Sequence, residues 1–153
     1  MRLYPERSGD RATPRFDPRI VHVGSVGYLR ILLVDNELPV LDSMKVVLEL
    51  DGHRVSGANG GQAGIDMFIA ALSGAEPFDA VITDLAMPGV DGRQLAHAVK
   101  SISPTTAVIL LTGWGAQSQD PAGVDCVLGK PPRLNELRAA LAKGTTAAGR
   151  AKG

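Results

Sequence analysis

The sequence has one cysteine, no excess of either charge and no long apolar stretch. Because Cys126 is alone, it cannot form an internal disulfide, and a small buried thiol is its expected role. Sixteen basic residues balance sixteen acidic residues, so no overall field draws the chain toward nucleic acid or a membrane. No apolar run approaches the roughly 18 residues of a membrane span, and residues 1–10 are charged rather than signal-like. We therefore expect a cytoplasmic protein with no nucleic-acid or membrane partner.

Four short apolar runs each end at a residue that can do chemistry. Runs of about four or five apolar residues are typical of strands buried on both faces. The residues at their ends are Asp35, Asp84, Thr112 and Lys130. In a parallel sheet the carboxyl ends of the strands open into one crevice, so we expect these four side chains to meet there.

Strand patterns alternate with helical patterns through the middle of the chain. We predict strands at about 31–34, 54–58, 80–84, 108–112 and 126–128, and helices at about 38–51, 62–72, 92–100 and 133–142. This alternation predicts an α/β fold, a doubly wound five-stranded parallel sheet with helices on both faces. The predicted inward positions include Leu50 of the first helix and Ile69 of the second.

The two ends of the chain have no helical or alternating period. We expect residues 1–28 to form a flexible N-terminal extension, residues 29–142 to form one domain, and residues 143–153 to form a disordered tail. Between the fourth and fifth strands, residues 116–124 are interrupted by Pro121 and Gly123. Nine such residues predict a fourth helix that is short or absent.

The ordered set of motifs resembles the receiver domain of two-component response regulators. It consists of the acid after the first strand, Asp84 with Met87-Pro88-Gly89 behind it, Thr112-Gly113, and Lys130-Pro131. The resemblance covers residues 29–142 and implies a flavodoxin-like sheet of order 2-1-3-4-5. It also implies a cis Lys130–Pro131 bond and a phosphoryl donor that is a histidine kinase or phosphotransfer protein.

The candidate site residues have roles that phosphoryl chemistry explains. Asp84 is the expected nucleophile, because a carboxylate can hold a phosphoryl group as an acyl phosphate. Lys130 and Thr112 would neutralise and position the phosphoryl oxygens. The predicted Mg²⁺ ligands are Asp35, Asn36, Asp84 and, by resemblance, the backbone carbonyl of Ala86. Any enzymatic activity would be limited to transfer onto its own aspartate and slow autodephosphorylation.

Two positions depart from the family's usual pattern. Asn36 stands where a second acid is usual, which lowers the expected affinity for Mg²⁺, and the neighbouring Glu37 could replace the missing carboxylate. Val127 stands where an aromatic ring commonly swings inward, so we expect an unusual output.

Three functional classes therefore remain. The first is a phosphoacceptor receiver. The second is a receiver-like protein-binding module that is not phosphorylated, which Asn36, Val127 and the short fourth helix favour. The third is an aspartate-dependent phosphohydrolase, a class that usually has a second aspartate where this chain has Ala86.

Overall fold

The computed structural model describes residues 28–113 and 123–152. Their elements alternate as the sequence predicts, with four helices and five strands in the described ranges. The strands are β2 (Arg30–Val34), β3 (Arg54–Ala58), β4 (Ala80–Asp84), β5 (Ala107–Thr112) and β6 (Cys126–Gly129). The helices are α1 (Leu38–Leu50), α2 (Gly61–Ser73), α3 (Gly92–Ile102) and α4 (Leu134–Lys152).

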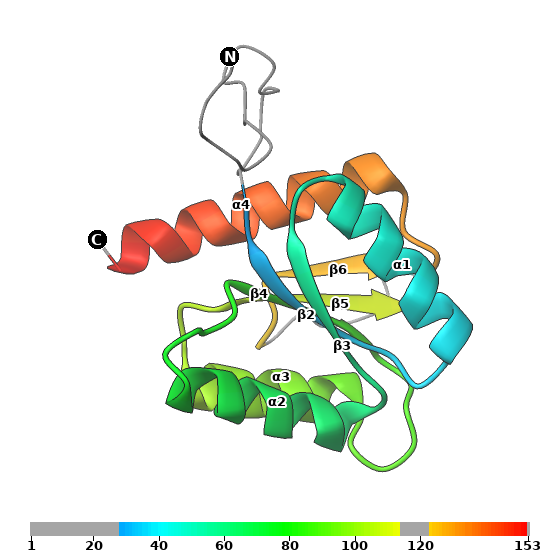
Figure 1. Ribbon diagram of the computed structural model, residues 1–153, viewed down its shortest axis with the longest axis horizontal. Coiled ribbons are helices and arrows are strands. Elements are labelled where there is room, and N and C mark those ends of the chain that lie inside the picture. The colour runs from blue at the N-terminus through cyan, green and yellow to red at the C-terminus, as the bar shows by residue number, and fades with distance from the viewer. Residues whose placement is uncertain (1–27, 114–122, 153) are drawn as a thin grey trace, which may run out of the picture.

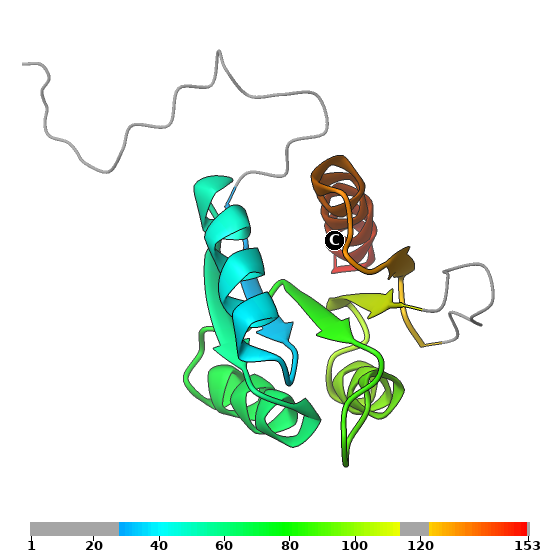
Figure 2. The same ribbon diagram turned by 90° about the vertical axis from the view of Figure 1, so that its right-hand side faces the viewer.

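All five strands form one parallel sheet of order β3-β2-β4-β5-β6. Counted along the chain this is the order 2-1-3-4-5, so the implied topology is confirmed. Figures 1 and 2 show α1 and α4 on one face of the sheet and α2 and α3 on the other. The architecture is the predicted three-layer doubly wound fold.

The apolar strands β2, β4 and β5 are buried on both faces because helices cover both sides of the sheet, whereas β6, at the edge of the sheet, is only partly buried. One core cluster joins the sheet to α1 and α4, and another joins it to α2 and α3. All residues of β4 and β5 are buried. Burial on both faces explains why these strands are apolar runs rather than alternating patterns.

The register of the strands sets the position of the site. Val34 pairs with Thr83, Asp84 with Leu111, and Thr112 with Gly129. The carboxyl ends of these strands are therefore aligned, and the residues that follow them lie along one edge of the sheet.

The last helix is longer than the sequence predicts. The expected end at residue 142 and the disordered tail from 143 are wrong, because α4 continues to Lys152. A Cβ at Gly144 would lie 3.0 Å from the Cβ of Ala107 in β5, so a residue without a side chain lets the helix pass close to the sheet. The Thr145 hydroxyl donates to the Leu141 carbonyl at 2.6 Å within the same helix.

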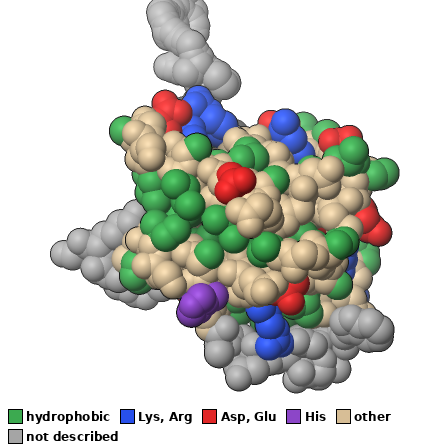
Figure 3. Space-filling view, turned by 90° about the horizontal axis from the view of Figure 1, so that it is seen from below, with side chains coloured by type: hydrophobic (Ala, Val, Ile, Leu, Met, Phe, Trp, Pro, Cys, Tyr) green, Lys and Arg blue, Asp and Glu red, His purple; other side chains and the backbone are tan. Residues whose placement is uncertain are grey.

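Some predicted inward positions face solvent instead. Leu50 is 81% exposed at the end of α1, and Ile69 is 45% exposed on α2. Figure 3 shows apolar side chains gathered with few charges on the face formed by α2 and α3. The sequence of α2 itself contains a single charged residue, Asp66.

Several predictions fall where the structure gives no description. The N-terminal extension lies outside the described residues except for Tyr28, which is exposed. The predicted short fourth helix at 116–124 also lies outside them, apart from its last two residues. Among the described residues, no helix is both long enough and apolar enough to cross a membrane.

Candidate functional site

Two carboxylates and one ammonium group meet at the carboxyl edge of the sheet. Lys130 Nζ lies 3.0 Å from Asp35 Oδ2 and 3.1 Å from Asp84 Oδ2. The two carboxylate side chains are 3% and 8% exposed, and that of Lys130 is 18% exposed. The structure therefore brings together three of the residues that the sequence predicts at this edge. Thr112 is buried at the end of the neighbouring β5.

Backbone hydrogen bonds hold these residues in place. The Asp35 N–H donates to the Ala58 carbonyl at 3.1 Å, so the strand pairing continues one residue past β2. Asp35 Oδ1 accepts the N–H of Glu37 at 2.8 Å, which turns the chain toward α1. On the other side the Lys130 N–H donates to the Thr112 carbonyl at 2.9 Å. The Lys130–Pro131 peptide bond is cis, as the resemblance implies.

The charges of the site are coupled. Burial raises the pKa of Asp84 above its usual value, although the hydrogen bond from Lys130 counteracts part of this change. Burial also disfavours the ammonium form of Lys130, but its hydrogen bonds to Asp35 and Asp84 prevail and raise the Lys130 pKa. Lys130 is thus positively charged at neutral pH. Asp84 is a more basic carboxylate than an exposed aspartate.

The loop that follows Asp84 is packed with little free space. A Cβ on Gly92 would collide with the Asp84 carbonyl oxygen and would lie 2.7 Å from a methyl group of Leu110. The Gly92 N–H donates to the Leu85 carbonyl at 2.9 Å, and α3 begins with a capping box between Asp91 and Gln94. The loop that carries Ala86 is therefore anchored at both ends. Ala86 itself is exposed.

The donor set suits a hard cation. Within residues 28–113 and 123–152, no group of three or more acidic, histidine or cysteine side chains is placed to hold a metal ion. The buried pair Asp35 and Asp84 already shares one cationic group, the Lys130 ammonium. Mg²⁺ is commonly held by one or two carboxylates together with water and other oxygens. The two buried carboxylates therefore fit Mg²⁺. Asn36 and Ala86 are exposed residues that follow Asp35 and Asp84 in the sequence.

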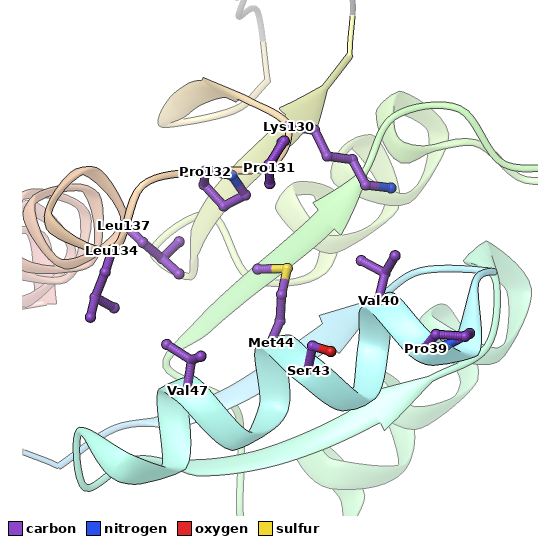
Figure 4. A pocket seen from close by; sticks show the side chains of 10 residues that line it. All are labelled: Pro39, Val40, Ser43, Met44, Val47, Lys130, Pro131, Pro132, Leu134 and Leu137. Carbon is purple, nitrogen blue, oxygen red and sulfur yellow. The ribbon is translucent and has the colours of Figure 1, made fainter.

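An apolar groove lies beside this cluster. It has a volume of about 580 Å³ and runs between α1 and the segment from Lys130 into α4. Its lining consists of Pro39, Val40, Ser43, Met44, Val47, Lys130, Pro131, Pro132, Leu134 and Leu137. Figure 4 shows Val40, Met44 and Val47 of α1 on one side, with the two prolines and the start of α4 opposite them. Lys130 belongs to both the groove and the carboxylate cluster.

The groove is the feature that sequence reasoning missed. The helical spacing of α1 predicts that its apolar residues face the core, yet the structure buries only Leu41 and Leu48 of this helix. The signal was present in the number of apolar residues, since α1 has more of them than one buried face requires. Val127, the other position at which the sequence departs from the family's pattern, is partly buried in β6.

Known proteins share this combination of fold and motifs. The family model of the response regulator receiver domain matches residues 31–142. Response regulator MprA of Mycolicibacterium vanbaalenii is 32% identical over 117 residues, which are 74% of this chain and 48% of MprA. A solved receiver domain protein from Clostridium thermocellum has 31% identity and a TM-score of 0.72, with 80% of this chain and 98% of that chain covered.

A third similar protein is the response regulator TrrA of Thermotoga maritima, which has been solved in complex with Mg²⁺ and BeF. It has 26% identity and a TM-score of 0.68, and the match covers 76% of this chain and 98% of TrrA. TrrA has also been solved in complex with the histidine kinase ThkA. This chain spans about half the length of the curated relatives it matches. Because the family model matches most of the chain, from residue 31 to residue 142, the chain belongs to the response regulator receiver domain family.

Proposed function

We propose that this receiver domain acts in the cytoplasm and accepts a phosphoryl group on Asp84 from a histidine kinase or a phosphotransfer protein. The observation that carries the proposal is the cluster in which Lys130 Nζ lies 3.0 Å from Asp35 and 3.1 Å from Asp84. A basic carboxylate beside an ammonium group combines a nucleophile with a partner for the incoming negative charge.

The reaction requires little of the protein beyond position and charge. A carboxylate oxygen of Asp84 attacks phosphorus, the bond from phosphorus to the donor's imidazole nitrogen breaks, and an acyl phosphate forms. Lys130 then pairs with a phosphoryl oxygen, and the Thr112 hydroxyl donates to another. Attack of water on phosphorus later releases inorganic phosphate and restores the Asp84 carboxylate.

The proposed cofactor is Mg²⁺. When bound, it supplies positive charge that neutralises a phosphoryl oxygen during transfer. Asp35, Asp84 and the Ala86 carbonyl would hold it, and Asn36 would contribute a neutral amide oxygen where a carboxylate is usual. The complex of TrrA with Mg²⁺ and BeF supports this assignment by similarity.

The groove suits the helix that would carry a phosphodonor histidine. Apolar residues line both of its sides, and Lys130 links it to the cluster around Asp84. A helix with an apolar stripe that lies in this groove would bring a neighbouring side chain to the edge of the site. The complex of TrrA with ThkA supports a histidine kinase as the partner.

The phosphoacceptor is tested with a small phosphodonor that needs no docking surface. The chain is incubated with Mg²⁺ and acetyl phosphate, and its intact mass is measured. We expect one added phosphoryl group that is lost at alkaline pH and is absent from Asp84→Asn. Asp91→Asn is the matched control, because it makes the same change at the end of the same loop and asparagine is an equally good helix cap. Phosphorylation of Asp84→Asn would refute the assignment.

The docking surface is tested by comparing two donors. Met44→Asp places a charge in the groove, whereas Ile69→Asp places one on exposed α2. We expect Met44→Asp to slow transfer from the cognate kinase at least tenfold and to leave the reaction with acetyl phosphate unchanged. Ile69→Asp should leave both reactions unchanged. Equal rates of phosphoryl transfer from the kinase to both variants would show that the kinase does not bind in the groove.

A second candidate is a binding module that is not phosphorylated. Asn36 favours it, because the site has one carboxylate fewer than is usual in the family. In that case no phosphoryl group would be added by acetyl phosphate or by the cognate kinase, and a charge in the groove would still weaken partner binding.

A further inference from the structure

The ammonium group of Lys130 has a third acidic neighbour outside the buried pair. Lys130 Nζ lies 3.8 Å from Glu37 Oε1, and the Glu37 side chain is 61% exposed. The contacts of the ammonium to Asp35 and Asp84 are shorter, at 3.0 and 3.1 Å. Lys130 thus has two buried carboxylates on its inner side and one solvated carboxylate on its outer side.

Among the described residues, the ion pair with Lys130 is the interaction found for the Glu37 side chain. It occupies the residue before α1, yet its side chain makes no capping hydrogen bond, and glutamate is not among the favoured residues at this position. Its backbone is fixed, because its N–H donates to Asp35 Oδ1 and its carbonyl accepts from Leu41. The backbone hydrogen bonds therefore place residue 37 beside Lys130, and its carboxylate remains largely exposed to solvent.

The proposed function requires the Asp35 and Asp84 carboxylates to bind two cations in turn, the Lys130 ammonium group and Mg²⁺. In the metal-free protein Lys130 occupies them, and the proposed function requires the same two groups to hold Mg²⁺. An ammonium group and a divalent cation repel each other strongly at such short range. Lys130 therefore has to withdraw from Asp35 and Asp84 when the metal binds. Among the ion pairs of Lys130 within the described residues, that with Glu37 is the remaining one.

Glu37 does not join the buried pair as a third ligand. The described residues contain no group of three acidic, histidine or cysteine side chains arranged to hold a metal ion. Its contact is made to the lysine, on the solvent side of the site. The hypothesis that Glu37 replaces the acid missing at Asn36 thus has no support in the geometry.

We propose that Glu37 is a positioning residue for Lys130, which receives the ammonium group when a divalent cation takes Asp35 and Asp84. This inference rests on the proposed function, since it requires the metal to bind there. In this role Glu37 assists metal binding indirectly, because it accepts the ammonium group that leaves Asp35 and Asp84. The site thereby compensates in part for the neutral amide at position 36.

A double-mutant cycle tests the proposal by isothermal titration of the metal-free chain with Mg²⁺. We expect Glu37→Gln to weaken Mg²⁺ binding about two- to fivefold, the range of an exposed ion pair. In the background of Lys130→Gln, the same change should alter the affinity less than about 1.5-fold, because no ammonium group remains to be received. Glu49→Gln, which removes the same charge from the exposed far end of α1, should have no effect in either background.

The outcomes separate this inference from the proposed function. An equal loss from Glu37→Gln in both backgrounds would show that Glu37 acts on the metal directly, and no loss in either would show that it has no role. Each result overturns the inference and leaves the metal site intact. Mg²⁺ affinity that is unchanged in Asp84→Asn would instead refute the metal site itself. Circular dichroism verifies that each variant is folded.

A second readout follows the lysine itself. In the native chain we expect the ¹³Cε resonance of Lys130 to shift as Mg²⁺ is added, and the size of this shift to change in Glu37→Gln. A shift that is identical with and without the Glu37 carboxylate would contradict transfer of the ammonium group to this residue.

Discussion

Replacement of Lys130 by methionine should destabilise the metal-free protein in a way that depends on pH and on Mg²⁺. The substitution keeps most of the alkyl chain but removes the charge shared by Asp35 and Asp84. Both carboxylates lie about 3 Å from the ammonium group, so they are no more than about 6 Å apart. At that distance and an effective dielectric constant of about 20, two negative charges repel by about 3 kcal/mol.

The pH dependence follows from Asp84. Burial already raises its pKa, and Lys130 is the group that counteracts this, so the Asp84 pKa in Lys130→Met rises further. A carboxyl group whose pKa is higher in the folded protein takes up a proton more readily there than in the unfolded chain. The free energy of unfolding of the variant therefore increases as the pH falls through the raised pKa of Asp84.

The assay is urea denaturation followed by far-ultraviolet circular dichroism, in EDTA or in Mg²⁺, from pH 5 to pH 8. We expect Lys130→Met to lose about 3 kcal/mol at pH 8 in EDTA, and this loss to be smaller at pH 5 or in Mg²⁺. Arg138→Met is the control, because it breaks an exposed ion pair with Asp51 at 2.8 Å and should cause a far smaller loss that Mg²⁺ does not reverse. A loss in Lys130→Met that is the same at both pH values and in both buffers would refute this account of the site's charges.

Three further predictions concern the packing of the loop, the metal and the response. Gly92→Ala should lower the free energy of unfolding by about 1–3 kcal/mol, because its Cβ would collide with the Asp84 carbonyl. In the same denaturation assay, Gly113→Ala should leave the free energy of unfolding nearly unchanged, because a Cβ there meets nothing within 4 Å. Asn36→Asp should tighten Mg²⁺ binding about fivefold or more in a calorimetric titration, since an added charge near the metal contributes about 1 kcal/mol or more; equal affinities would contradict a role for position 36. Hydrogen exchange with Mg²⁺ and BeF should change most in residues 86–91, whereas changes greatest along α4 would show that the output follows another route.

The sequence predicts the sheet and its edge because strand burial and strand ends are local signals. The apolar runs of β2, β4 and β5 are buried on both faces and are followed by polar residues, so parallel pairing alone brings Asp35 and Asp84 to one edge. The order of the strands came from the family resemblance, since no local pattern specifies it.

The remaining features depend on contacts between distant segments. The continuation of α4 past residue 142 brings Gly144 close to Ala107 of β5, a contact that no helical period reveals. The groove exists because α1 and the segment Pro131-Pro132 face each other without closing. The contact of Glu37 with Lys130 likewise joins two residues that are far apart in the sequence. Local pattern therefore predicts which residues reach the site but not what surrounds them.

The central claim is that Asp84 is the residue that carries the phosphoryl group, and the direct measurement is to locate that group in the sequence. The chain is phosphorylated with acetyl phosphate and Mg²⁺ and then treated with borohydride, which reduces an aspartyl phosphate to homoserine. Peptide mass spectrometry then locates the change. We predict homoserine at position 84 alone. Modification at another residue, or none in the folded protein, would contradict the account.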